Sequence, residues 1–319
     1  MAITRYLKIG EEAEYGVEAT EYPETLDPES ASIDPEGDDK LIYEGMGGLD
    51  RTVGLGVYST AGDITIPLDD LVSGWFFKWA LGEYEVTGTD DGEGNITAPY
   101  THIFTPSTKP LMDSFSAKIG KDIFEHVFLG NVISSISIEV DSEWALMTVS
   151  TVGAKDKKDV LADTVDYTEG QFFTAPMASL TKGNTDKSAS VNSLSLTIET
   201  GADIESSQGF GSRFPTKAFR GSTVVEMEME LGFDDEEELL AFWGGNDGPS
   251  NSSIEEMDYT LSFGDNIDFI FPRVVYTASG QPAEGREGIT QSVTARALYD
   301  DVEKVGPIQI TITNDKETY

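Results

Sequence analysis

The side chains that could perform acid–base or metal chemistry are two histidines and a large number of carboxylates. His102 and His126 each stand in a strand-like stretch, Tyr-Thr-His-Ile-Phe and Phe-Glu-His-Val-Phe. Two histidines cannot form a three-histidine zinc site, and no carboxylate stands at a spacing that completes one. We therefore expect both histidines on strand faces, and we predict that the chain is not an enzyme and has no metal or cofactor.

The carboxylates alone do not define a catalytic site. With 58 Asp and Glu residues, pairs suited to glycoside hydrolysis occur by chance. Asp63, Asp69 and Asp70 are more simply explained as a strand face and a helix cap. The acidic run 234–238 could bind a cation, but the first turn of a helix, where the dipole favours negative charge, is the preferred interpretation.

Two further kinds of site are excluded by composition and motif. The chain has no cysteine, which excludes disulfides and Cys-ligated zinc or iron–sulfur centres. The glycine-rich stretches at 45–48 and 209–213 lack the lysine and the strand-to-helix context of a phosphate-binding loop.

The secondary structure that must position these residues is most clearly predicted between residues 220 and 245. Apolar residues alternate with glutamates over 225–231, which predicts a strand with one apolar face and one acidic face. The pattern at 234–237 is typical of a capping box, and Gly244 is suited to end the helix that follows. We predict this helix over 234–244.

The same order of elements occurs earlier in the chain. Residues 63–68 alternate, Asp69-Asp70 can start a helix, and Trp75 and Trp79 lie on its apolar stripe before Gly82. This predicts a helix over 69–81. The repetition predicts a chain built from two related halves.

Together these patterns predict an all-β fold with two short helices, similar to a sandwich or barrel. We predict four segments: an irregular N-terminal arm (1–40), a first β half (41–153), a connecting segment (154–190) and a second β half (191–319), the halves together forming one domain. Long strands with polar outer faces have edges that an assembly of copies would pair.

The charge balance is extreme, with 58 acidic against 21 basic residues and a net charge of −37. At ordinary salt such a charge opposes compaction, whereas molar salt shortens the screening length to about 3 Å. The composition therefore indicates a halophilic, haloarchaeal source. Lys and Arg are scattered and form no patch for gripping nucleic acid. No secretion signal or membrane span is recognisable, so we expect a protein made in the cytoplasm that does not contact membranes.

The recurring units resemble the major tail tube proteins of long-tailed, siphovirus-like viruses. The resemblance lies in the alternating strands 62–68 and 221–231, each followed by a Trp-containing helix and a glycine, and in the similar strands 128–140 and 190–199. It covers most of residues 40–313. The acid load departs from the family and fits a virus of a haloarchaeal host.

The resemblance implies a sandwich-like subunit whose copies form hexameric rings. Stacked rings make a tube with a continuous β-barrel as its inner wall, through which viral DNA passes during genome ejection. The implied partners are further copies of the chain, the tape-measure protein, the tail terminator and distal tail or baseplate proteins. The implied location is the virion tail, and no active site is implied.

A lumen through which DNA slides should repel phosphates, because Lys or Arg would hold them. Candidate lumen-lining residues are Glu226, Glu228, Glu230, Glu139 and Asp141. These side chains could instead face outward to brine or lie beneath a loop. Candidate contacts between rings are the proline-containing arm 20–39, the loop or hairpin 83–100 and the segment 154–190.

Three other functions stay open at this point. One is a different head–tail or baseplate component with a similar sandwich. A surface-layer or adhesin domain is opposed by the missing export signal. An all-β hydrolase is opposed by the lack of a converging set of catalytic residues.

Overall fold

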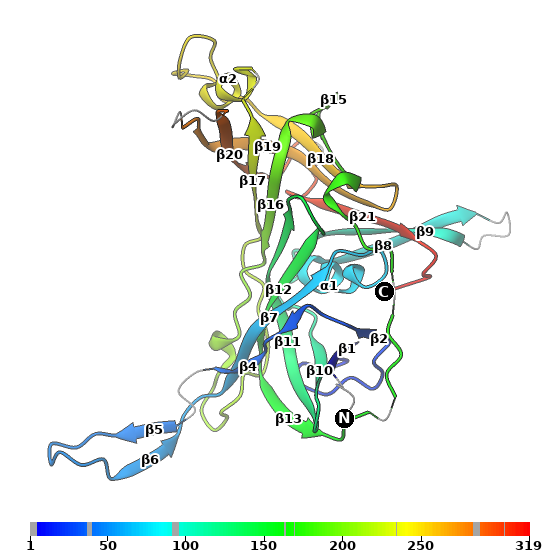
Figure 1. Ribbon diagram of the computed structural model, residues 1–319. Coiled ribbons are helices and arrows are strands. Elements are labelled where there is room, and N and C mark those ends of the chain that lie inside the picture. The colour runs from blue at the N-terminus through cyan, green and yellow to red at the C-terminus, as the bar shows by residue number, and fades with distance from the viewer. Residues whose placement is uncertain are drawn as a thin grey trace.

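The computed structural model describes residues 5–36, 40–90, 96–162, 164–168, 170–233, 235–282, 288–302 and 304–319. Antiparallel strands and two α-helices, α1 (Ser73–Leu81) and α2 (Glu237–Trp243), make up the fold (Figure 1). Short 3-10 turns lie in connecting segments: η1 (Ala175–Met177), η2 (Ser188–Ser190) and η3 (Glu205–Ser207). The prediction of a mostly β chain with two short α-helices is confirmed.

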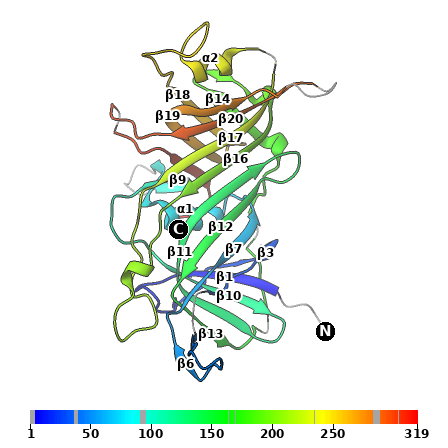
Figure 2. The ribbon, with the colours of Figure 1, turned by 90° about the vertical axis from the view of Figure 1, so that its left-hand side faces the viewer.

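One continuous antiparallel array of strands, here called the long sheet, runs through the molecule. Its order across the sheet is β3 (Ser30–Ala31) and β4 (Asp34–Glu36) at one edge, then β7 (Ser59–Pro67), β12 (Leu146–Gly153), β11 (Glu125–Val140), β16 (Val191–Glu199), β17 (Val224–Gly232), β20 (Thr290–Ala297) and β19 (Ile267–Gly280). Figure 2 looks onto this sheet, with its strands crossing the view diagonally and α1 behind it.

Two smaller sheets branch from the long sheet because β11 and β19 are long enough to belong to two sheets each. The basal sheet has the order β2 (Glu24–Leu26), β1 (Arg5–Glu11), β10 (Phe115–Lys121), the start of β11, and β13 (Lys155–Asp159). The distal sheet has the order β15 (Thr185–Asp186), β14 (Ala178–Lys182), β18 (Met257–Phe263), the start of β19, β21 (Gln309–Asn314), β9 (Ile96–Pro106) and β8 (Gly82–Asp90).

Gly130 marks the point at which β11 passes from the basal sheet to the long sheet. Its φ is +70°, and a Cβ there would meet the Ala154 side chain at 2.9 Å, so only glycine fits. The Gly130 N–H donates to the buried carboxylate of Glu12 (2.8 Å), which also accepts hydrogen bonds from Ser114 and Ser116. These contacts hold the bend in place.

Helix α1 lies against the inner face of the long sheet and supplies Trp79, the largest fully buried side chain of the core. Trp79 stacks on Phe115 of β10 with ring centroids 4.4 Å apart, and Phe77 packs edge-on against Phe269 of β19. All four side chains are fully buried. The helix therefore joins the basal and distal sheets behind the long sheet.

The two predicted helix starts are wrong by a few residues. The predicted helix 69–81 begins at Ser73, because the Asp69 carboxylate accepts hydrogen bonds from the N–H groups of Leu71 and Val72 and holds a turn there. The predicted helix 234–244 is observed over Glu237–Trp243, and the predicted capping residue Asp234 lies outside the described residues. Both helices end at a left-handed glycine, as expected.

Helix α2 contributes less to the core than α1 does. Only Glu238 and Ala241 are buried, while Phe242 is 38% exposed. The helix sits at one end of the long sheet (Figure 1), so one side of it has no sheet beneath it.

The segment 1–40, predicted to be irregular, contains regular strands. Leu7 and Ile9 of β1 are fully buried against β10, and Ile33 is buried beside β7. These contacts join residues far apart in sequence, so the local pattern did not reveal them. The predicted loop or hairpin 83–100 is the hairpin β8–β9, whose residues 91–95 lie outside the described residues, as do residues 37–39 of the predicted arm.

A prediction concerns the buried carboxyl of Asp69, whose burial raises its pKa from 3.8 to about 6. The folded state then holds more protons than the unfolded state between pH 4 and 6, so this group stabilises the fold as pH falls through that range. Relative to Asp69→Asn, the wild type should gain stability by on the order of 2–3 kcal/mol between pH 7 and pH 4. Urea denaturation at both pH values measures this. Asp63→Asn, at an exposed position on β7, is the matched control, and an equal change in both variants would contradict the assignment.

Candidate functional site

The outer face of the long sheet is a polar surface formed by regular strands. Burial in β17 alternates strictly: Val225, Met227, Met229 and Leu231 are buried, and the three glutamates between them are exposed. The second half of β11, β12 and β16 follow the same alternation in register with their neighbours, so the apolar side chains of these strands share one face of the sheet. The opposite face carries the polar side chains.

The five predicted acidic residues share this outer face. Ser195 of β16 pairs with Glu139 of β11 on one side and with Glu228 of β17 on the other. Glu226 and Glu230 pair with Thr197 and Ser193 in the same way. Asp141 follows β11 directly and, with Glu139, Glu228 and Glu230, borders a shallow hollow on this face. The structure thus brings the predicted residues together across three adjacent strands.

Hydroxyl side chains fill most of the remaining face. One row crosses six strands in register, from Thr65 through Thr148, Ser137, Thr197 and Glu226 to Arg296. Arg296 is the one cation in this row, and it lies 3.6 Å from the Glu226 carboxylate, with both side chains nearly half exposed. This face therefore exposes carboxylates and neutral hydroxyls. The Arg296 guanidinium on it already pairs with the Glu226 carboxylate.

The two histidines have structural contacts. His102 is buried between the Tyr84 hydroxyl (2.9 Å) and the Asn314 side-chain oxygen (3.0 Å), and burial lowers its pKa. His126 contacts the Asp156 carboxylate at 2.6 Å on the basal sheet. The two rings lie on different sheets. Across the described residues, no group of three or more His, Asp or Glu side chains has the geometry to hold a metal ion.

Two carboxylates of the acidic run 234–238, those of Glu237 and Glu238, pair with lysines. Lys182 and Lys187 contact the Glu238 carboxylate at 2.8 and 3.4 Å, and both also contact Glu237. Tyr276 donates a hydrogen bond to Glu238 and a short contact joins it to Tyr259, while burial raises the pKa of both tyrosines. These ion pairs fasten α2 to β14 and its turn.

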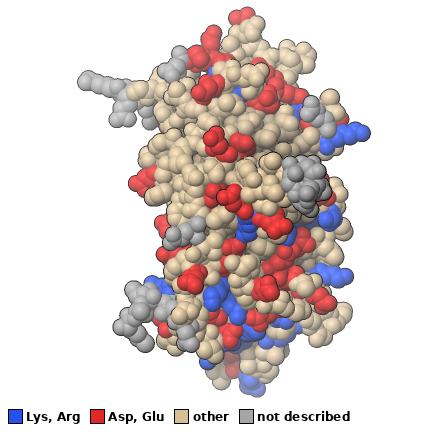
Figure 3. All heavy atoms as spheres, turned by 90° about the vertical axis from the view of Figure 1, so that its right-hand side faces the viewer, with Lys and Arg blue, Asp and Glu red and all other residues tan. Residues whose placement is uncertain are grey.

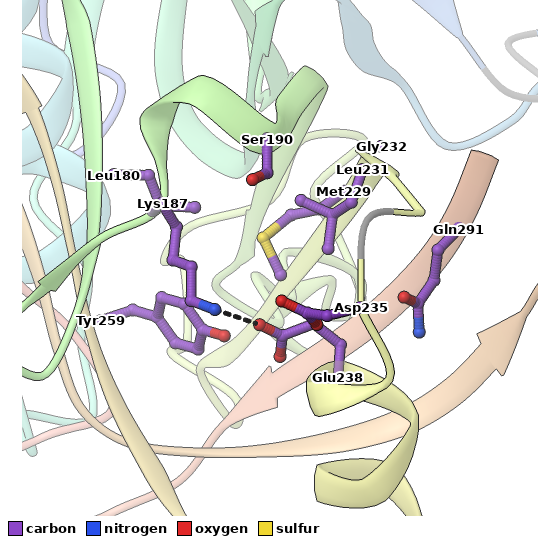
Figure 4. A pocket seen from close by; sticks show the side chains of 10 residues that line it. All are labelled: Leu180, Lys187, Ser190, Met229, Leu231, Gly232, Asp235, Glu238, Tyr259 and Gln291. Atoms are coloured by element: carbon purple, nitrogen blue, oxygen red, sulfur yellow. Dashed lines mark ion pairs between the residues drawn. The ribbon is translucent and has the colours of Figure 1, made fainter. Parts of the chain in front are cut away.

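A small cavity lies beside this network (Figure 4). Lys187 points across it to Glu238, and Met229, Leu231 and Tyr259 form part of its apolar lining. Its volume of about 30 Å³ suits a single water molecule rather than a substrate. We interpret it as a packing gap beneath α2.

The sequence interpretation missed one surface, the hairpin of β5 (Lys40–Tyr43) and β6 (Thr52–Leu55). The hairpin forms a two-stranded sheet of its own and projects from the body of the molecule (Figure 1). Leu41, Ile42, Tyr43, Val53 and Leu55 are between 53% and 70% exposed. A two-stranded hairpin is marginal in water, and an apolar one requires a partner. The apolar residues beside the glycine-rich turn 45–48 were the available signal.

A polar sheet face together with an exposed apolar hairpin is typical of the class of structural assembly proteins. More specifically, the chain matches the family described as phage tail tube protein over residues 3–297, and it belongs to that family. No curated protein matches the chain. The protein is therefore a structural component of a viral tail, found in the virion, and not an enzyme. In the part of the chain that is described, no helix has the length and apolarity needed to cross a membrane.

A prediction separates the two kinds of ion pair described above. Glu238→Gln should lower the free energy of unfolding by about 3 kcal/mol, because it leaves two mostly buried ammonium groups with one fewer carboxylate. Arg296→Ala, at the exposed pair, should change it by less than about 1 kcal/mol. Urea denaturation at low and molar salt measures both. Equal effects, or an Arg296 effect that grows with salt, would contradict this distinction.

Proposed function

We propose that this protein is the major subunit of a tail tube, and that the outer face of its long sheet lines the lumen through which viral DNA passes. Family membership implies assembly of copies into a tube. The observation that carries the lumen assignment is the in-register face of carboxylates and hydroxyls formed by β11, β16 and β17. The other face of the same sheet packs on the core and cannot line a channel.

The distribution of cations supports this orientation. Lys118 lies within 3.0 Å of carboxylates of both Glu18 and Asp159 on the basal sheet, and Lys182 and Lys187 lie beside α2. Figure 3 views the molecule from the side opposite to Figure 2, and there Lys and Arg are interspersed with Asp and Glu. A DNA duplex sliding along the long sheet would meet a repulsive surface with low friction.

The β5–β6 hairpin supplies a contact between rings in this proposal. The hairpin contacts a copy of this chain in the adjoining ring, because it projects away from the long sheet and is apolar (Figure 1). The arm 20–39, the hairpin 83–100 and the segment 154–190 are further candidates for ring contacts.

The resemblance to siphovirus tail tubes supplies the remaining proposed partners: the tape-measure protein inside the tube during assembly, the terminator, and distal tail or baseplate proteins. The net charge of −37 supports a haloarchaeal host, since molar salt screens the mutual repulsion of stacked acidic subunits.

Electron microscopy of the purified protein in molar salt tests the proposed function. Rings or tubes of uniform diameter are expected, and lowering the salt should dissociate them as repulsion between subunits grows. Monodisperse monomers at every salt concentration would contradict the proposal.

The hairpin provides a control within the same experiment. Ile42→Asp/Val53→Asp should leave the monomer folded and abolish long tubes, because charges would be placed in the proposed ring contact. Ile123→Asp, at a position 82% exposed in the β10–β11 turn, should leave the tubes long. Long tubes from the hairpin variant would remove the hairpin from the proposal.

A prediction for the lumen uses charge reversal. Glu226→Lys/Glu228→Lys should leave tubes intact and reduce genome delivery roughly tenfold or more, because each ring would then hold phosphates. Infectivity and DNA release from purified particles measure this. Asp247→Lys/Glu255→Lys makes the same charge change on the exposed loop after α2 and should infect normally. Normal infection by the Glu226/Glu228 variant would show that this face does not line the lumen.

A further inference from the structure

We propose that each ring contains three copies of this chain, and that β19 of one copy pairs with the β3–β4 edge of the next copy as β11 pairs with β16 inside the chain. This inference rests on the proposed function and deepens it, because it names the partner surface and the copy number. It replaces the six copies that the resemblance implied.

The first observation is that the long sheet repeats one order of strands. Its first four positions are β3–β4, β7, β12 and β11, and its last four are β16, β17, β20 and β19. In both series the strands appear along the chain in the order first, second, fourth, third. In both series, therefore, the last strand along the chain inserts between the second strand and the long one.

The elements between the strands follow the same plan. A helix follows the second strand in each series, β7 before α1 and β17 before α2, and each helix ends at a left-handed glycine. The long strands β11 and β19 are each preceded by an antiparallel partner outside the long sheet, β10 and β18 respectively. Each long strand then passes into the long sheet and is followed by its return strand, β12 or β20. We infer that the two series are equivalent units.

The junction between the two units is visible within the chain. Residues 135–140 of β11 pair antiparallel with residues 194–199 of β16, which is the last strand of one unit against the first strand of the next. The equivalent strands at the outer edges of the long sheet are β19 and β3–β4. They are too far apart in the sheet to pair within one chain, because the six other strands of the long sheet lie between them.

These two edges have the backbone and side-chain pattern that such a junction needs. Among the described residues, β19 pairs with β20 up to Gly280, whereas its pairing with β18 ends at Val274, so one edge of 275–280 has no strand against it. The β3–β4 edge pairs only with β7 among those residues. Tyr276 and Ile33 are buried on the core side, and Thr277 and Asp34 are exposed on the polar side, so both faces would continue across the junction.

The size of the bore distinguishes three copies from six. The long sheet brings eight strand positions per chain, so three copies give a wall of 24 strands and six copies give 48. With strands about 4.8 Å apart and tilted by about 40°, the backbone diameters are roughly 50 Å and roughly 100 Å. The smaller wall admits one DNA duplex with its hydration and the side chains of the wall. The larger wall would leave most of the bore empty.

The proposal also predicts the symmetry of the outer surface. The hairpin β5–β6 stands between the first and second strands of the first unit only, and the corresponding segment 200–223 of the second unit contains no hairpin strands. The hairpin β8–β9 likewise follows α1 and has no counterpart after α2. A ring of three chains therefore has six wall units and three sets of projecting hairpins.

Thiol cross-linking tests the junction, because the chain has no cysteine of its own. Asp34→Cys/Thr277→Cys places one thiol at each edge of every chain. Treating assembled tubes with a bis-maleimide should give denaturing-gel bands of one, two and three chains, and the trimer should be the largest species. Each single variant should give no ladder. Ser135→Cys/Glu199→Cys, at residues paired in the β11–β16 junction, should link within the chain and keep the monomer mass.

End-on views of the same tubes give a second measurement, and threefold symmetry of the outer surface is expected. A ladder that continues to six chains with sixfold end-on views would overturn the proposal while leaving the tail tube function intact. Intact tubes without linked chains, alongside successful linking of Ser135→Cys/Glu199→Cys, would overturn it equally. If the wild type forms no ring or tube at any salt, the proposed function fails, and this inference fails with it.

Discussion

The structure depends on keeping the alternation of side chains in phase across every strand of the long sheet. A one-residue slip of β17 would place Glu226 and Glu228 in the core and Met227 in solvent. The cost of burying unpaired carboxylates makes that slip prohibitive. The alternation thus fixes the register, and through the register it determines which residues of distant strands become neighbours. The same constraint creates the polar face and the surface on which α1 packs.

This constraint explains which parts of the fold could be predicted. The strand 225–231 and its acidic face were evident because the pattern is local. That Glu139 lies across Ser195 from Glu228 was not evident, because it depends on β16 pairing with both β11 and β17. The strand β1 was missed for the same reason, since Leu7 and Ile9 are buried by β10, more than a hundred residues away. The start of α1 was misplaced because Asp69 caps a turn before the helix rather than the helix itself.

The charges are sorted by location, although the sequence shows them as evenly scattered. Several lysines lie against partly or largely buried carboxylates, as Lys118 does with Glu125 and Lys182 with Glu238. A buried carboxylate needs such a partner because desolvation of an unpaired charge is costly. The carboxylates on the outer face of the long sheet are exposed to solvent. They therefore need no cation, and the ion pair of Glu226 with Arg296 is itself half exposed. The requirement for pairing in the interior therefore draws cations away from the sheet face and leaves that face acidic.

In the ring that we propose, joining two wall units in one chain has a physical consequence for assembly. In a ring of single-unit subunits, every junction forms between separate molecules and loses translational freedom. With two units per chain, the β11–β16 junction forms during folding, and half of the junctions in the ring no longer depend on concentration. The two units are then free to differ outside the wall, because each needs to match its neighbour only along its edge strands. The hairpins β5–β6 and β8–β9 occur in one unit alone, which agrees with this expectation. The wall keeps its repeating pattern of strands, while the surface that contacts other rings and partners differs at every second unit.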